Sequence, residues 1–118
     1  MASNRDFADE VVGRLTPLGP VSWRRMFGGF GIYLDGVMFG LIAYDTLYFK
    51  IDDQNRPDYE QAGSQPFTYE GKRKPVEMSY WRVPDDVFGD IEAFAAWGEK
   101  AHAAARRAKA KKAPKRRR

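Results

Sequence analysis

Residues 24–40, RRMFGGFGIYLDGVMFG, decide how this chain folds. The segment holds five glycines among large apolar and aromatic side chains. Near its centre, Asp35 and Gly36 are typical of a two-residue β-turn with positive φ angles. Apolar residues alternate on both sides of this turn, so the segment predicts a β-hairpin. The turn then pairs Leu34 with Val37, Tyr33 with Met38, Ile32 with Phe39 and Gly31 with Gly40.

The glycines also raise the question of a phosphate site, since some glycine-rich loops bind phosphate groups. Such a loop requires a strand, a glycine turn and then a helix whose free N–H groups contact the anion. Here another strand follows, so we interpret Gly28 and Gly29 as a bend between strands. Gly31 and Gly40, facing each other, would leave a flat floor for close approach. A helix of the same chain is the expected occupant, and a ligand or partner surface is the alternative.

The alternating pattern on either side of the hairpin predicts four strands, near residues 21–27, 29–34, 37–44 and 47–52. A two-residue turn at residues 45–46 would pair Leu47 with Tyr44, on the wrong face of the sheet. We therefore expect a turn one residue longer, which pairs Leu47 with Ala43 and Phe49 with Leu41. The buried face of the hairpin then carries Phe30, Ile32, Leu34, Val37, Phe39, Leu41 and Ala43.

Apolar residues at helical spacing predict three main helices. Ser3 or Asn4 can cap the first, whose apolar residues are Phe7, Val11, Leu15 and Leu18. A short second helix follows Asn55 or Asp53 as its N-cap. After a short helical turn, a longer helix starts at Asp90, and its apolar stripe consists of Ile91, Phe94, Ala95, Trp97 and Ala101.

Two further strands, around residues 67–69 and 76–80, bring the number of strands to about six. The order of elements is helix, four strands, helix, two strands, helix. This order predicts an α+β fold: an antiparallel, curved meander sheet with N-terminal, middle and C-terminal helices packed against it. The 118 residues suffice for one domain, which we place at residues 1–105, followed by a basic and flexible tail at 106–118.

The basic residues are distributed unevenly. Residues 106–118 hold nine of the 20 lysines and arginines and no acidic residue, whereas residues 1–105 hold 11 basic against 16 acidic residues, a net charge of −5. The tail would attract any polyanion through counterion release, with little sequence preference, or serve only as a solubilising extension. Its cations are Arg106, Arg107, Lys109, Lys111, Lys112, Lys115, Arg116, Arg117 and Arg118.

The composition also limits the class of protein. There is no cysteine, which excludes disulfides, thiolate zinc sites and cysteine nucleophiles. No apolar run approaches the roughly 20 residues that a membrane span needs. The N-terminal residues do not have the pattern of a secretory signal. We therefore expect a cytoplasmic protein without membrane association.

No catalytic constellation is apparent. His102 is the only histidine, is expected at the surface of the last helix, and has no partner ligands for a metal. The carboxylate pairs at 52–53 and 85–86 stand where helices begin, so capping and the helix dipole explain them. The serines lack a positioned histidine. We expect no enzyme activity, no cofactor and no metal.

Two groups of side chains are candidates for contacts. Arg24 and Arg25 point to opposite faces of a strand, where each either forms a salt bridge or contacts an anion, a nucleic acid or a partner. Lys72, Arg73 and Lys74 join them if their turn comes close. The aromatic rings are expected mostly in the core, and the best candidates for exposed rings are Trp81 and Tyr48.

The chain also resembles a known family. Residues 24–52, together with AGSQPFTYEGKRKPVEMSYWRVPDD at 62–86, closely resemble the N-terminal domain of the TfoX/Sxy family, and the resemblance covers roughly residues 7–107. Its most specific part is the motif Met26, Phe27, Gly28 and Gly29. The family is named for regulators of natural competence, which act with the cyclic-AMP receptor protein at certain promoters. Those regulators carry a second, C-terminal helical domain, so the resemblance implies a stand-alone N-terminal domain here and supplies no catalytic residues.

These observations lead to two functional hypotheses. The first is a small regulatory or adaptor domain that binds a protein partner and is linked to transcription or competence regulation. Its tail would bind nucleic acid non-specifically. The second is a small-molecule-binding domain or an enzyme with a pocket beside the Gly31–Gly40 floor. Arg24, Arg25, Tyr33 or Lys50 would line that pocket.

Overall fold

The structure, a computed structural model, describes residues 4–26, 28–70 and 75–112. It contains one antiparallel sheet of six strands in the order β1-β2-β3-β4-β6-β5. The strands are β1 (Ser22–Met26), β2 (Gly29–Leu34), β3 (Val37–Ala43), β4 (Thr46–Lys50), β5 (Pro66–Glu70) and β6 (Pro75–Arg82). The helices are α1 (Arg5–Arg14), the 3-10 turn η1 (Thr16–Leu18), α2 (Arg56–Gln61), α3 (Asp85–Phe88) and α4 (Ile91–Lys112).

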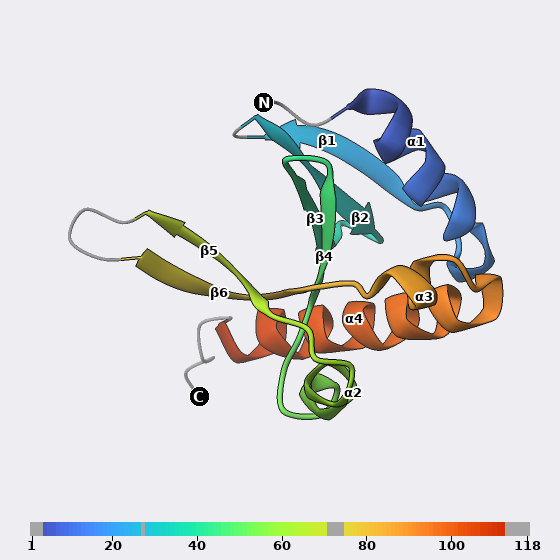
Figure 1. Cartoon of the computed structure of the whole chain (residues 1–118). Helices are drawn as coiled ribbons and strands as arrows, with labels where there is room; N and C mark the ends of the chain where they lie inside the picture. Colours follow the sequence, from blue (N-terminus) through green and yellow to red (C-terminus); the bar gives the residue numbers. More distant parts are fainter. Residues whose placement is uncertain (1–3, 27, 71–74, 113–118) are drawn as a thin grey trace, which may run out of the picture.

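The helices gather on one side of the sheet. In Figure 1, α1, α3 and α4 lie against β1 to β4, whereas the β5–β6 hairpin extends away from them. The α+β class, the six antiparallel strands and the N-terminal, middle and C-terminal helices expected from the sequence are therefore confirmed.

The core lies between this sheet face and the helices. Phe49 of β4 stacks on Phe94 of α4 with ring centroids 5.4 Å apart, and Phe39 packs beside it at 6.0 Å. Gly98 lets α4 approach closely, because a Cβ there would lie 2.8 Å from Leu15 of α1's C-cap. Helix α4 thus packs against both the sheet and the end of α1.

The β2–β3 turn agrees with the sequence prediction, but the pairing beyond it does not. Asp35 and Gly36 have φ angles of 54° and 75°, and the first two expected pairs form. A β-bulge then makes Phe39 an extra residue, so that Ile32 pairs with Gly40. Gly31 pairs instead with Leu41, so the predicted facing of Gly31 and Gly40 is wrong.

The bulge also shifts everything that follows along β3. Ile42 is fully buried, while Leu41 and Ala43 lie half-buried on the other face. The next turn has two residues, Tyr44 and Asp45, and pairs Leu47 with Ile42. The longer turn predicted from the sequence is therefore wrong: one extra residue in the strand, and not in the turn, brings the apolar side chains to one face.

The starts of α1 and α4 follow the expected chemistry, whereas Asn55, at the N-cap of α2, forms no capping hydrogen bond with its side chain. The side chain of Asn4 caps α1 by accepting a hydrogen bond from the N–H of Asp6 at 2.6 Å. Asp90 precedes α4 and accepts from the N–H of Ala93 at 3.0 Å. Ile91, however, is 67 % exposed, so it does not belong to the buried stripe as predicted. Ser3, the other candidate cap, lies outside the described residues.

Candidate functional site

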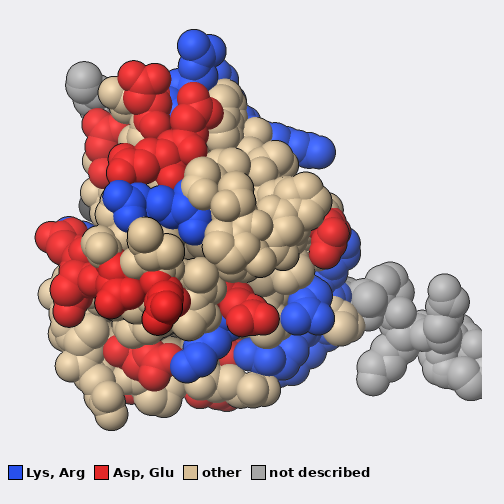
Figure 2. Space-filling model, turned by 90° about the vertical axis from the view of Figure 1, so that its right-hand side faces the viewer, with Lys and Arg blue, Asp and Glu red and all other residues tan. Residues whose placement is uncertain are grey.

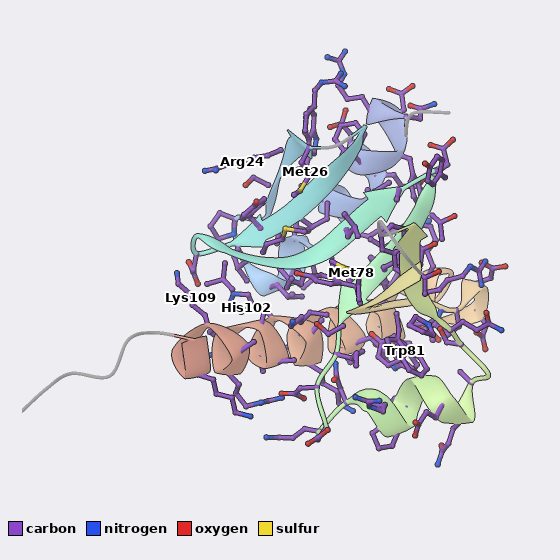
Figure 3. All side chains as sticks on the ribbon, turned by 90° about the vertical axis from the view of Figure 1, so that its left-hand side faces the viewer. Arg24, Met26, Met78, Trp81, His102 and Lys109 are labelled. Carbon is purple, nitrogen blue, oxygen red and sulfur yellow. The ribbon has the colours of Figure 1, made fainter. Side chains whose placement is uncertain are left out.

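The sheet face opposite the helices carries an open trough of about 740 Å³. No residue of α1, α2, α3 or α4 lines it. Figure 3 looks onto this face and shows Met26 and Met78 on separate strands across it. The lining residues are predominantly apolar: Met26, Met38, Leu41, Ile42, Ala43, Tyr44, Phe67, Thr68, Met78 and Tyr80, with Gly29 at one margin.

The bulge and a glycine build this trough. Alternation alone would put Met38 and Leu41 on opposite faces, but the extra residue Phe39 brings both to the trough. Gly31 leaves room for the sulfur atoms, since a Cβ there would lie 2.8 Å from the Sδ of Met26 and 3.1 Å from that of Met38. These methionines and Tyr33, and not a helix, occupy the space beside Gly31. The expected helix-covered glycine floor is therefore wrong.

Two cations stand beside aromatic rings on this face of the sheet, one on each side of β3. The guanidinium of Arg24 lies 5.0 Å from the ring centroid of Tyr33, and the ammonium of Lys50 lies 5.3 Å from that of Tyr80. Lys50 also donates to the hydroxyl of Ser79 at 2.6 Å. Burial raises the pKa of Tyr80 to about 12.

Arg25 lies on the opposite face from Arg24, as the sequence predicts. Its guanidinium is 5.4 Å from the ring of Phe30, on the core side of the sheet. Within the described residues, neither arginine forms an ion pair with a carboxylate. Of the two alternatives for this pair, salt bridges do not form within the described residues, whereas contacts with an anion or a partner stay a prediction. Both side chains form cation–π contacts instead, because the pairing of β1 with β2 sets aromatic rings beside them.

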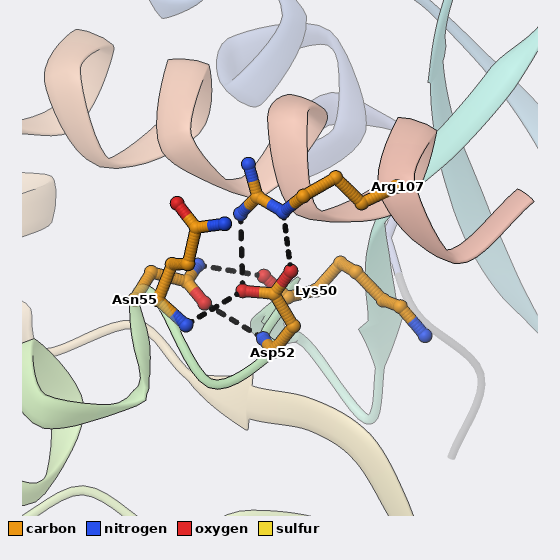
Figure 4. Close-up of polar contacts among 5 residues, drawn as sticks. Lys50, Asp52, Asn55 and Arg107 are labelled. Atoms are coloured by element: carbon orange, nitrogen blue, oxygen red, sulfur yellow. Dashed lines mark hydrogen bonds and ion pairs between the residues drawn. The ribbon is translucent and has the colours of Figure 1, made fainter. Parts of the chain in front are cut away.

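A second feature is the basic end of α4, which Asp52 anchors to the sheet. Arg107 donates two hydrogen bonds to the carboxylate of Asp52, at 2.7 and 3.0 Å (Figure 4). Asn55 supports the same loop, accepting from the N–H of Asp52 at 2.8 Å and donating to the carbonyl of Lys50 at 3.0 Å. The hydrogen bonds from Arg107 hold the pKa of Asp52 below its usual value.

This anchor predicts a pH-dependent contribution to stability. The pKa of Asp52 is lower in the folded protein than in the unfolded chain. The ion pair therefore contributes fully to stability above the pKa of the unfolded state, and the contribution is lost as the pH falls through the pKa of the folded state. Both side chains are partly exposed, so Asp52→Asn should lower the free energy of unfolding by only about 0.2–1 kcal/mol at pH 7. Urea unfolding at pH 7 and pH 3 checks this. A difference in unfolding free energy between the wild type and Asp52→Asn that is larger at pH 3 than at pH 7 contradicts this prediction.

Helix α4 continues through the start of the basic segment. It runs to Lys112, so residues 106–112 are its last turns, and Arg106, Lys109 and Lys111 are exposed there. The separation of a domain at 1–105 from a tail at 106–118 stays a prediction. Residues named above that lie outside the described part of the chain are Phe27, Lys72, Arg73, Lys74, Lys115, Arg116, Arg117 and Arg118.

Two expected surface residues are buried. His102 is 7 % exposed, and its Nε2 lies 2.9 Å from the carbonyl oxygen of Leu34 at the hairpin end. It lies on the buried face of α4, which also carries residues 94, 98, 101 and 105. Its position four residues after Gly98, one helical turn, could have identified it as buried. Trp81 is also buried, at 9 % exposure, because it points to the helix side and packs on Tyr59 of α2. Tyr48 is half-buried, with its ring 4.9 Å from Phe67.

Neither carboxylate pair forms a two-carboxylate site. Asp52 pairs with Arg107, and Asp85, in the first turn of α3, pairs with Arg82 at 3.0 Å. Within residues 4–26, 28–70 and 75–112, no group of three or more histidine, cysteine, aspartate or glutamate side chains could hold a metal ion. In the same residues, no helix has both the length and the hydropathy to span a bilayer.

Comparison with known proteins agrees with the resemblance seen in the sequence. A family model described as the TfoX N-terminal domain matches residues 14–105. No curated protein matches the chain. The matched region includes the whole sheet and most of α4. Because it covers well over half of the 118 residues, the chain belongs to the TfoX N-terminal domain family.

Proposed function

We propose that this protein is a regulatory adaptor that binds a protein partner through the helix-free face of its sheet and holds nucleic acid loosely through the basic end of α4. Its family is regulatory and related to competence regulators. The partner would belong to the transcription machinery, and the protein would act in the cytoplasm. The single observation that supports this proposal most is the methionine-lined trough, an apolar surface on the side of the sheet that no helix lines.

The composition of the trough favours a protein partner. Methionine is unbranched and polarizable, so methionine-rich surfaces adapt to varied apolar side chains and recur at protein-binding sites. Three of the protein's four methionines line this trough, from β1, β3 and β6. They bring no nucleophile and no pair of titratable groups of the kind that catalysis uses.

The helix side has a different character. Figure 2 shows that acidic side chains are numerous on the face that α1 and α3 occupy, with smaller groups of lysine and arginine between them. Such a surface disfavours polyanions. Any nucleic acid would therefore meet the cations at the end of α4, away from this face.

Affinity purification from the native cytoplasm tests the protein contact. The full-length protein, immobilised, should retain a specific partner with and without nuclease treatment. Leu41→Glu should lose it, because a carboxylate would enter the apolar floor of the trough. Glu99→Gln on the exposed face of α4 serves as the matched control and should retain it. Equal retention by the wild type and Leu41→Glu contradicts the proposal.

Neutralising the basic end of α4 should weaken nucleic-acid binding. The triple variant Lys109→Gln, Lys111→Gln, Lys112→Gln removes three cations, so the slope of log K against log salt should fall by up to about 2.7 for duplex DNA. Fluorescence anisotropy between about 50 and 200 mM salt measures it. Lys100→Gln, whose ammonium pairs with Asp58 at 3.0 Å, is the control. An unchanged slope would mean that the basic end of α4 does not contact the nucleic acid.

A further inference from the structure

We propose that the trough receives one amphipathic helix of the partner protein, with acidic residues that meet Arg24 and Lys50. This inference rests on the proposed function and specifies its occupant. Four observations carry it: the dimensions of the trough, its apolar lining, the cations on either side of β3, and the conformation of Tyr44 at the margin of the trough.

The dimensions fit one short helix. Along β3, the lining runs from Met38 to Tyr44. Six residues of strand span about 20 Å, at about 3.3 Å per residue. A helix rises about 1.5 Å per residue, so about 13 residues, or between three and four turns, cover this length. A helix in a groove presents apolar side chains at positions i, i+3 or i+4, and i+7. The methionines, with Leu41 and Phe67, provide the apolar counterpart.

The charges favour an acidic occupant. Arg24 is exposed and, among the described residues, forms no ion pair, although it lies over Tyr33 beside the first methionines. Lys50 is held over Tyr80, which itself lines the trough. An occupant with carboxylates near Arg24 and Lys50 therefore complements the surface.

Tyr44 supplies an anchor at the margin of the trough. It is 72 % exposed and has a φ of 53°, a left-handed conformation that a Cβ disfavours. Both residues of this turn are left-handed, so the fold holds a large aromatic ring in the open at the margin of the trough. Exposed tyrosines recur among the residues that dominate binding, and strained backbone recurs at functional sites.

The same contacts disfavour two other occupants. A nucleic-acid platform needs open aromatic faces, but Arg24 and Lys50 lie over Tyr33 and Tyr80, and Tyr48 packs edge-on with Phe67. A second copy of the chain could place a helix in the trough only if it exposed an apolar one. The large hydrophobic side chains exposed in the described part of the chain are Tyr44 and Ile91, on different elements.

Selection from a displayed library of helix-stabilised peptides of about 14 residues tests this proposal. We expect enriched peptides with an apolar stripe bordered by acidic residues. A synthetic representative should lose at least about tenfold in affinity for Leu41→Glu. The same peptide should also bind the Arg24→Glu variant more weakly than the wild type. A second peptide, with lysine in place of the acidic residues, should bind Arg24→Glu with restored affinity. Tyr44→Asn should weaken binding while raising the melting temperature, since asparagine tolerates the left-handed conformation.

Several results would overturn the inference. These are enrichment of basic or uncharged peptides, no enrichment against the wild type, and displacement of the peptide by single-stranded oligo-dT. A wild-type dimer in light scattering that Leu41→Glu abolishes would assign the trough to a second copy. If Leu41→Glu no longer binds the purified partner but no helical peptide is selected, the proposed function is supported and the helical occupant is rejected.

Discussion

Replacing Gly29 with alanine is expected to lower the free energy of unfolding by about 3 kcal/mol or more, the largest effect of any conservative change in the hairpin. Gly29 begins β2, and a Cβ there would lie well inside the van der Waals contact distance to the backbone carbonyl oxygen of Ile42. A backbone atom cannot rotate away as a side chain can. The strands β2 and β3 would have to separate where Phe30 pairs with Ile42 in the core.

A second glycine provides the matched control. Gly13 lies in α1, and a Cβ there would meet no atom within 4 Å. Gly13→Ala should therefore raise stability by about 0.5–1 kcal/mol, the usual gain from removing glycine from a helix. Urea unfolding of both variants compares them directly. If Gly29→Ala stays within about 1 kcal/mol of the wild type, close contact between β2 and β3 does not explain this glycine.

Truncating Phe49 to alanine is expected to cost about 3–5 kcal/mol, a large part of the total stability of a small domain. Phe49 is fully buried and lies between the sheet and α4. Its ring stacks on Phe94 and packs beside Phe39, so its removal leaves a cavity lined by rigid rings. A cavity of this kind closes poorly, which raises the cost.

Two milder variants separate this effect from a general loss of apolar surface. Phe49→Leu, which fills most of the same volume, should cost about 1 kcal/mol. Ile91→Ala, at a position 67 % exposed, should change stability by less than about 0.5 kcal/mol. Thermal and urea unfolding report both. A similar loss for Phe49→Ala and Ile91→Ala would mean that the contact of α4 with the sheet does not hold the fold together.

Most of the fold could be predicted because it follows from local chemistry. The Asp35–Gly36 turn, the cap at Asn4 and the order of the elements each depend on a few neighbouring residues. The β-bulge at Phe39 could not be predicted, because alternation within one strand does not reveal an extra residue. That single residue accounts for two errors, the facing glycines and the longer turn before β4.

The candidate site was harder to foresee than the fold. Met26, Met38 and Met78 come from three strands that are distant in the sequence, and the bulge and Gly31 bring their side chains to one surface. No local pattern marks such a surface. The burial of His102 had a local signal, since it adjoins the buried positions 101 and 105 of α4, but its hydrogen bond to Leu34 depends on how the helix docks.

The most direct measurement is a methionine-methyl NMR spectrum of the full-length protein, labelled with ¹³C at these methyl groups, alone and with the purified partner. Three of the four methionines line the trough. If the helix-free face binds the partner, the signals of Met26, Met38 and Met78 will shift together, and the backbone amides of α1 and α3 will not. Partner binding that leaves these three methyl signals in place and shifts the amides of α1 or α3 would contradict a binding surface in the trough.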